Sequence, residues 1–240
     1  MRAHPERELS DLQQLHYARY LNERISGKPT QYITGHQEFW GLDILVNPAV
    51  LIPRPETEHL VERAIRLATD HRLTRIADCG TGSGCIALAL AQDLAAATVH
   101  ATDISRPALE TAVSNARHLN LPVSFVECDL LTAFRDASID LVVSNPPYVA
   151  LADRDTLARE VRDHEPPGAL FAGEDGTSVY RRLIPELARV LRPGAWAVVE
   201  LGYNVANTAR QLFSTRLWDS LATDSDLAGI ERVLYARCRS

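Results

Sequence analysis

The sequence predicts an α/β fold: a doubly wound, mostly parallel seven-stranded sheet with an antiparallel edge strand, preceded by a short N-terminal helical segment and a hairpin. Three observations predict it. Apolar strand candidates alternate with helical stretches over most of the chain, which is typical of a sheet with helices on both faces. A glycine-rich loop joins the first strand of this series to a helix. The last two strand candidates have no clear helix between them, which favours an antiparallel pair at one edge.

The first 55 residues are expected to form two small units ahead of the main domain. Residues 1–28 carry leucines and tyrosines near helical spacing over 9–25, which predicts one amphipathic helix of a few turns. Residues 29–55 carry aromatic and β-branched residues around two glycines, followed by a proline-rich stretch. That composition predicts a hairpin or short strands and then a linker.

The main domain is expected to span residues 56–240 and to begin with a helix at about Glu56, next to Pro55. Its strand candidates are 74–79, 97–103, 123–128, 139–144, 194–201 and 231–238, with one more expected within 214–224. Its helical stretches are 85–97, 106–119 and 179–191. The chain has 240 residues, of which 46% are hydrophobic, so one large domain can bury a sizeable core.

Composition narrows the class of protein. No apolar run is long enough to cross a bilayer, and the polar N-terminus lacks the apolar segment of a signal peptide. We therefore expect a cytoplasmic protein without membrane contact. The formal net charge is −6, which argues against stable binding to nucleic-acid phosphate. The four cysteines fit no common zinc pattern, and the eight histidines are scattered. Free thiols and no metal are expected.

The glycine loop "ADCGTGSGC" covers residues 77–85, with Gly80, Gly82 and Gly84 at alternate positions. Such a loop lets the backbone approach a ligand closely, and its N–H groups face the start of a helix. A dinucleotide fingerprint requires its last glycine where Cys85 stands. A tight strand–helix turn without a ligand is the alternative interpretation of the loop alone.

Three acidic residues stand near the ends of neighbouring strands. Asp103 ends the second strand of the series, 19 residues after Gly84, where a carboxylate suits two ribose hydroxyls. Asp129 follows the third strand, within reach of an adenine edge. Asp78 precedes the loop and suits a cationic group. Together these acids indicate a ligand that carries adenosine. The missing third glycine, with Asp78 beside it, favours S-adenosylmethionine over NAD.

The run Asn145-Pro146-Pro147-Tyr148 follows the apolar strand candidate 139–144. Neither proline donates to a sheet, so the strand ends in a stiff turn. An amide or arylamine nitrogen is a poor nucleophile, and two acceptors on its N–H groups would orient it. The Asn145 side-chain oxygen and the Pro146 carbonyl suit that role, and the Tyr148 ring suits the flat face of the group. Positioning then supplies most of the rate enhancement. A rigid turn without function is the alternative.

These motifs together carry a family resemblance. The glycine loop and Asn-Pro-Pro-Tyr resemble the amino-methylating class I methyltransferases, which have a Rossmann-like fold. Blocks 29–58, 160–176 and 226–237 narrow the resemblance to the release factor glutamine methyltransferases. The family uses S-adenosylmethionine to methylate the glutamine amide in the Gly-Gly-Gln loop of class I release factors.

The resemblance also implies roles for individual residues. The cofactor set is Asp78, Gly80, Thr81, Gly82, Ser83, Gly84, Asp103, Asp129, Leu130 and Asn145. The catalytic set is Asn145, Pro146 and Tyr148. Pro147 joins these three in binding the substrate amide.

The chain departs from the family pattern in three places. Only 28 residues precede the block at 29–58, where members usually carry several helices, and Leu130 stands where some members carry an aromatic residue. Many members also carry a glutamine shortly after the position of Gly202.

Two rival functions stay open: an adenine amino-methyltransferase acting on DNA or RNA, and a non-catalytic S-adenosylmethionine-binding module. Arg54, between two prolines, has two candidate roles, which are closing over the donor and forming a structural ion pair.

Overall fold

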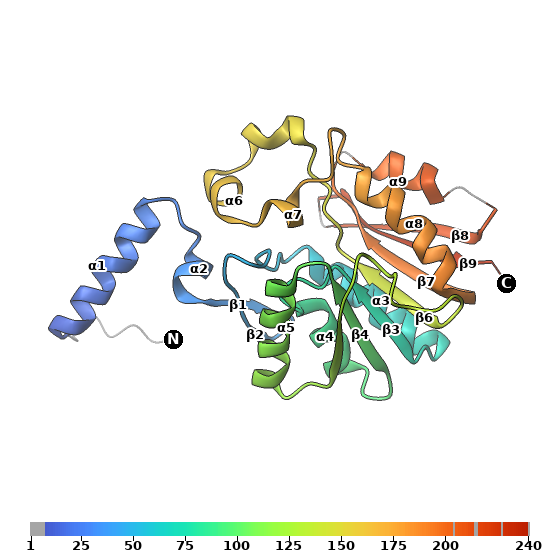
Figure 1. The fold of residues 1–240 in the computed structure, drawn as a ribbon, viewed down its shortest axis with the longest axis horizontal. Coiled ribbons are helices and arrows are strands. Elements are labelled where there is room, and N and C mark those ends of the chain that lie inside the picture. Colours follow the sequence, from blue (N-terminus) through green and yellow to red (C-terminus); the bar gives the residue numbers. More distant parts are fainter. Residues whose placement is uncertain (1–7, 204, 214–215, 227, 240) are drawn as a thin grey trace.

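A seven-stranded sheet forms the centre of the computed structural model, which describes residues 8–203, 205–213, 216–226 and 228–239 (Figure 1). Its strands are β3 (Arg75–Cys79), β4 (Thr98–Asp103), β5 (Val123–Glu127), β6 (Ile139–Ser144), β7 (Leu191–Glu200), β8 (Trp218–Ser225) and β9 (Glu231–Cys238). The order is β5-β4-β3-β6-β7-β9-β8. The first five strands are parallel, and β9 is antiparallel to both β7 and β8. The predicted fold class and the antiparallel edge pair are confirmed.

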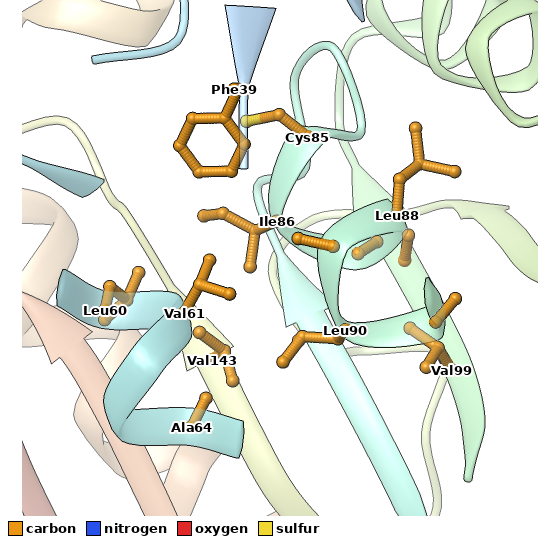
Figure 2. Close-up of a cluster of buried hydrophobic side chains, with 14 of the residues drawn as sticks. Phe39, Leu60, Val61, Ala64, Cys85, Ile86, Leu88, Leu90, Val99 and Val143 are labelled. Carbon is orange, nitrogen blue, oxygen red and sulfur yellow. The ribbon is translucent and has the colours of Figure 1, made fainter. Parts of the chain in front are cut away.

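Helices cover both faces of the sheet, as the strand–helix alternation predicts. One face carries α3 (Thr57–His71), α4 (Cys85–Asp93) and α5 (Arg106–Leu119), and the other carries α8 (Ser178–Val190) and α9 (Ala206–Phe213). The helix α9 between β7 and β8 was not predicted. Figure 2 shows the first core, where Leu60 and Val61 of α3 face Ile86 of α4 and Val143 of β6. Burying each large apolar side chain contributes about 1.5–3 kcal/mol.

The N-terminal elements are α1 (Asp11–Ile25), α2 (Thr30–Thr34), β1 (His36–Phe39) and β2 (Leu42–Leu45). The predicted helix over 9–25 begins at Asp11 because Ser10 and Gln13 form a capping box. The hairpin is confirmed, but residues 32–34 are helical. Gly35 ends that helix with φ 82°, and the chain then enters β1. The boundaries at residues 28 and 55 stay predictions.

The helix α1 projects away from the sheet and buries none of its residues, all of which are described (Figure 1). Its exposed apolar side chains include Leu12, Leu15 and Ile25. An ion pair of 2.6 Å joins Arg24 near its C-terminal end to Glu160. None of the described helices has the length and apolar character needed to cross a bilayer.

The connection 149–172 contains three short helices that sequence periodicity did not predict: η1 (Leu151–Thr156), α6 (Arg159–His164) and α7 (Pro167–Leu170). Its two ends are hydrogen-bonded to each other. The Val149 N–H donates to the Leu170 carbonyl and the Ala172 N–H donates to the Val149 carbonyl, each at 2.9 Å. The connection therefore leaves and rejoins the domain at one point, next to the end of β6.

Candidate active site

Three strand ends meet at the carboxyl edge of the sheet. β3 lies between β4 and β6, with Cys79 opposite both Thr102 and Ser144. The N–H groups of Gly80 and Thr81 both donate to the Thr102 carbonyl at 2.9 Å. The Ser144 hydroxyl donates to the Cys79 carbonyl at 2.7 Å. The glycine loop is thus held between the end of β4 and the start of the Asn-Pro-Pro-Tyr run.

The glycines of the loop have two different functions. Gly80, Gly82 and Gly84 all have positive φ, at 75°, 54° and 85°, which disfavours any other residue. A Cβ at Gly80 or Gly82 would meet no atom of the described residues within 4 Å, whereas one at Gly84 would lie 3.1 Å from the Ala112 Cβ. The first two glycines therefore leave open space for a ligand, and the third permits close packing on α5.

Asp78 lies fully buried beneath this loop. Its Oδ2 accepts a hydrogen bond of 2.6 Å from the Thr81 hydroxyl, and its Oδ1 has no partner among the described residues. Burial raises the pKa of the Asp78 carboxyl to about 7, against the opposing effect of the Thr81 hydrogen bond. Ser83 is also buried, and its carbonyl accepts a hydrogen bond from Asn115 at 2.9 Å. The orphaned Oδ1 suits the ammonium group of an amino-acid ligand.

Asp103 braces the loop from the end of β4. Its Oδ2 accepts the Gly82 N–H at 2.9 Å and its Oδ1 accepts the Ser105 N–H at 2.8 Å. Burial raises the pKa of Asp103, and these backbone hydrogen bonds oppose that effect. Each carboxylate oxygen keeps a further lone pair. The same side chain can therefore hold the loop and accept two ligand hydroxyls.

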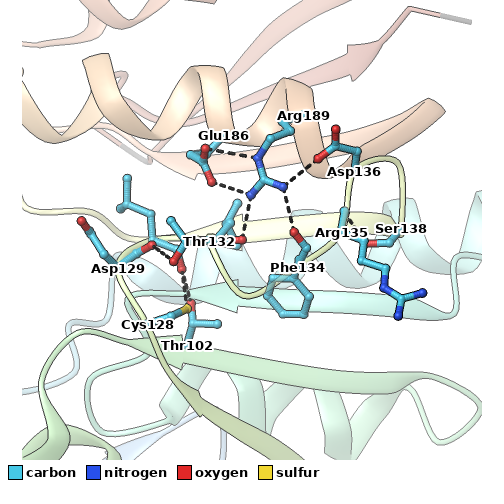
Figure 3. Close-up of polar contacts among 12 residues, drawn as sticks. Thr102, Cys128, Asp129, Thr132, Phe134, Arg135, Asp136, Ser138, Glu186 and Arg189 are labelled. Carbon is cyan, nitrogen blue, oxygen red and sulfur yellow. Dashed lines mark hydrogen bonds and ion pairs between the residues drawn. The ribbon is translucent and has the colours of Figure 1, made fainter.

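The segment after β5 brings Asp129 to the same edge (Figure 3), and Leu130 follows it in the chain. The Thr102 hydroxyl donates to the Leu130 carbonyl at 2.9 Å, and Leu130 has a φ of 51°, which is uncommon for a branched residue. Arg189 of α8 fixes the rest of the segment through the carbonyls of Leu131 and Phe134 at 3.0 and 2.8 Å. The segment is therefore held from both β4 and α8.

The carboxylate of Asp129 forms an ion pair with Arg182 of α8. Local sequence patterns do not predict this partner, since 53 residues separate Asp129 from Arg182 along the chain. Arg182 is exposed and Asp129 is half-exposed, so the ion pair contributes little to stability. The backbone of residues 129–130, which is held by the Thr102 hydrogen bond, is therefore more firmly fixed beside the expected adenine than the Asp129 side chain is.

Residues 145–148, here called the Asn145 turn, follow β6. The Asn145 Nδ2 donates to the Thr57 hydroxyl oxygen at 3.2 Å. Pro146 is buried, and Tyr148 packs on the second core, which is the cluster of buried apolar side chains on the face of the sheet that α8 and α9 cover. A Cβ at Gly202 would lie 2.5 Å from the Tyr148 Cδ2, and a Cβ at Gly176 would clash with the Tyr148 carbonyl. Two glycines from other segments therefore make room for Tyr148.

Sequence reasoning missed the acid behind this turn. Glu200 ends β7, as Asp103 ends β4, and it is buried. Burial raises the pKa of Glu200 to about 7, while hydrogen bonding from the side chains of Thr57 and Tyr148 and the charge of Arg232 oppose the rise. Its Oε2 has no partner among the described residues. An acid at the end of a buried strand was the available signal.

Arg54 pairs with Glu165, which favours the structural role among the two left open. Glu165 is buried, its Oε1 accepts from Arg54 at 2.5 Å, and its Oε2 accepts the Ile52 N–H at 3.2 Å. The pair ties the linker before α3 to the connection 149–172. The linker and the Asn145 turn are thereby held on the same side of the domain.

The residues at this edge of the sheet could bind a nucleoside and a planar N–H group side by side. The open glycine loop, the orphaned Asp78 oxygen and the Asp103 carboxylate fit a nucleoside that also carries an ammonium group, which agrees with S-adenosylmethionine. The Asn145 turn beside them offers oxygen acceptors and an aromatic ring to a flat N–H group. A bound donor and such a nitrogen would meet over the end of β6.

Comparisons with known proteins agree with this description. Residues 57–163 match the family described as the methyltransferase small domain, and residues 1–35 match the PrmC N-terminal domain. A release factor glutamine methyltransferase of Koribacter versatilis is 45% identical over 98% of this chain and 83% of its own length. That of Bradyrhizobium diazoefficiens is 43% identical over 95% of this chain and 79% of its own length.

Solved structures share the fold at lower identity. A methyltransferase from Pyrococcus furiosus aligns with a TM-score of 0.59 at 17% identity, over 96% of this chain and 100% of that chain. The 16S rRNA N2 G1207 methyltransferase of T. thermophilus, solved with AdoMet and guanosine, aligns with a TM-score of 0.58 at 19% identity. That match covers 85% of this chain and 50% of the other.

Proposed function

The chain belongs to the release factor glutamine methyltransferase family, and on that premise we propose that it transfers a methyl group from S-adenosylmethionine to a glutamine side-chain amide. The acceptor is the glutamine of the Gly-Gly-Gln loop of class I release factors, in the cytoplasm. The single observation that carries the proposal is the junction of the glycine loop with the Asn145 turn, through the 2.7 Å bond between Ser144 and Cys79.

The glycine loop and three acids hold the methyl donor in this proposal. Asp103 accepts the ribose hydroxyls, the Asp78 Oδ1 pairs with the ammonium group, and the Asp129–Leu130 backbone lies beside the adenine. Gly80 and Gly82 leave the space that the donor fills, and Thr81 and Ser83 complete the loop. When bound, S-adenosylmethionine supplies an electrophilic methyl group on a sulfonium.

The Asn145 turn orients the substrate amide. The Asn145 Oδ1 and the Pro146 carbonyl accept the two N–H groups, and this directs the nitrogen lone pair toward the donor. Pro147 stiffens the turn, and the Tyr148 ring covers one face of the planar amide. No strong base is needed, because the nitrogen that gains a methyl group releases its proton to water readily. Proximity and orientation supply most of the acceleration.

The net charge of −6 supports a protein acceptor over a nucleic acid, because stable phosphate binding relies on a basic surface. The nucleic-acid alternative uses the same turn, so the test must include it. The non-catalytic alternative predicts donor binding with no transfer at all.

The test is transfer of label from the donor to a purified class I release factor, with adenine-containing RNA and DNA as parallel acceptors. We expect label only in the release factor, and none when the glutamine of its Gly-Gly-Gln loop is replaced by alanine. Label in nucleic acid would establish the adenine methyltransferase instead. Donor binding by calorimetry without transfer to any acceptor would establish a binding module.

A further inference from the structure

The Asn145 side chain, which contacts the substrate in the proposed function, is itself positioned by a hydrogen bond to Thr57. The Asn145 Nδ2 donates to the Thr57 hydroxyl oxygen at 3.2 Å, and Thr57 is buried as the first residue of α3. A hydroxyl has one hydrogen to donate. If Thr57 accepts from Asn145, its own hydrogen must go to another acceptor. The identity of that acceptor decides which end of the Asn145 amide faces Thr57.

Glu200 is the acceptor that the structure offers. Its carboxyl group is buried behind the Asn145 turn, and the hydroxyls of Thr57 and Tyr148 lie close enough to favour its ionised form. The other charged or titratable groups that face it are Glu56 beside α3, Arg232 on β9 and Cys85 at the start of α4. Tyr180 of α8 donates to the Glu200 main-chain carbonyl at 2.7 Å.

The direction of these bonds follows from the charge on Glu200. An ionised carboxylate only accepts hydrogen bonds, so it takes the hydrogens of Thr57 and Tyr148. Thr57 then accepts from the amide nitrogen of Asn145, and the Asn145 Oδ1 is left for the substrate. A protonated Glu200 can donate to Thr57, which can then donate to Asn145. The amide would turn over and present its NH₂ group to the substrate N–H, which is a repulsive contact.

We propose that Thr57 and the ionised Glu200 are positioning residues that fix the Asn145 amide with its oxygen toward the substrate. The inference rests on the proposed function, and it assigns to these two residues the orientation of the group that the substrate touches. Neither contacts the reacting atoms. Their effect should therefore fall on the rate at saturating donor and acceptor.

The first test is kinetic. Thr57→Val keeps the shape of the side chain but removes the hydroxyl, and we expect kcat to fall about 10–100-fold with little change in the KM for the donor. Thr57→Ser restores the hydroxyl and should recover most of the rate. The matched control is Thr111→Val on α5. Thr111 is also a buried threonine that accepts from an asparagine, Asn47, at 2.9 Å. That variant should lose stability similarly and keep the parental kcat.

The second kinetic test uses pH at saturating donor. Because burial raises the pKa of Glu200 to about 7, the ionised form and the correct amide orientation are lost as the pH falls through that value. The parent kcat should decline on the acid side, and Glu200→Gln, whose side chain does not ionise, should lack that decline. A parental kcat in Thr57→Val, or the same acid decline in Glu200→Gln, would overturn the inference.

The third test needs no acceptor. The side-chain NH₂ resonances of Asn145 are identified in labelled protein by their loss in Asn145→Ala. They should titrate with a midpoint near pH 7 in the parent, since the orientation depends on Glu200, and should not titrate in Glu200→Gln. Absence of titration in the parent refutes the positioning role. If the parent methylates no release factor while this titration is present, the proposed function fails and the positioning of Asn145 stands.

Discussion

Replacing Gly202 by alanine tests whether the place of Tyr148 controls the reaction. The φ of Gly202 is not in the left-handed region, so the change adds a methyl group without backbone strain. That Cβ would lie 2.5 Å from the Tyr148 Cδ2, 2.7 Å from its Cγ and 3.1 Å from its Cβ. Ordinary van der Waals contact begins near 3.4 Å. The ring and the 202 backbone must therefore separate by about 1 Å.

The surroundings direct this displacement into the active site. Tyr148 follows two prolines, its carbonyl is in contact range of Gly176, and its ring packs on the second core. Overpacking of this kind costs about 1–3 kcal/mol of folding free energy. A shift of about 1 Å in a positioning group lowers a rate on the order of 100-fold, which corresponds to about 2.7 kcal/mol in activation free energy.

The assay is methyl transfer to a class I release factor, with donor affinity measured by calorimetry and stability by thermal denaturation. Gly202→Ala should lower kcat about 100-fold and leave donor affinity within a few-fold. The matched control is Gly168→Ala. That glycine also has no positive φ, and its added Cβ would lie more than 4 Å from every neighbour in the part of the chain that the structure describes, so every parameter should stay parental. A parental rate in Gly202→Ala would refute the view that the place of the Tyr148 ring limits transfer.

Three further outcomes are expected. Asp103→Ala removes two charge-assisted bonds to ribose, each worth on the order of 1.5–3 kcal/mol, and should weaken donor binding at least tenfold by calorimetry in a folded protein; unchanged affinity removes Asp103 from the site. Asn145→Ala should slow transfer by roughly two to three orders of magnitude, and Asn145→Asp should be slow with equal or tighter donor binding, because its charge stabilises the ground-state sulfonium most. Parental rates in both would leave the turn without a chemical role. Because burial raises the pKa of Asp78 to about 7 and a bound ammonium favours the ionised form, donor binding should release protons near neutral pH and weaken as the pH falls below about 7, whereas Asp78→Asn should bind weakly at all pH values.

The sequence predicted which residues share the carboxyl edge of the sheet because strand ends can be identified from local patterns, while the roles of these residues stay predictions. Asp103 ends a short strand, Gly80 and Asn145 each follow one, and parallel strands bring such residues to one edge. Most of the fold follows from the same patterns. The short helices of the connection 149–172 have four to six residues each, too few to display a helical period.

The residues that contact the Asn145 turn from other segments could not be predicted from local patterns. Thr57, Glu200 and Gly202 come from segments far from Asn145 in sequence, and their contacts depend on how deeply β7 and α3 are buried. The pairing of Asp129 with Arg182 depends on the rotation of α8 about its axis. Periodicity indicates which face of an element is apolar, but it does not give the register between elements.

The hydrogen bonds that join Val149 to Leu170 and Ala172 have a consequence for how the chain tolerates change. They close the base of the connection 149–172, so its outer residues form a loop whose ends stay fixed whatever its length. Doubling the length of such a loop costs only about 0.6 kcal/mol in closure entropy. Insertions between η1 and α6 should therefore be accepted without moving Asn145. The outer surface of this connection can therefore change in length and composition while the geometry at the end of β6 stays constant.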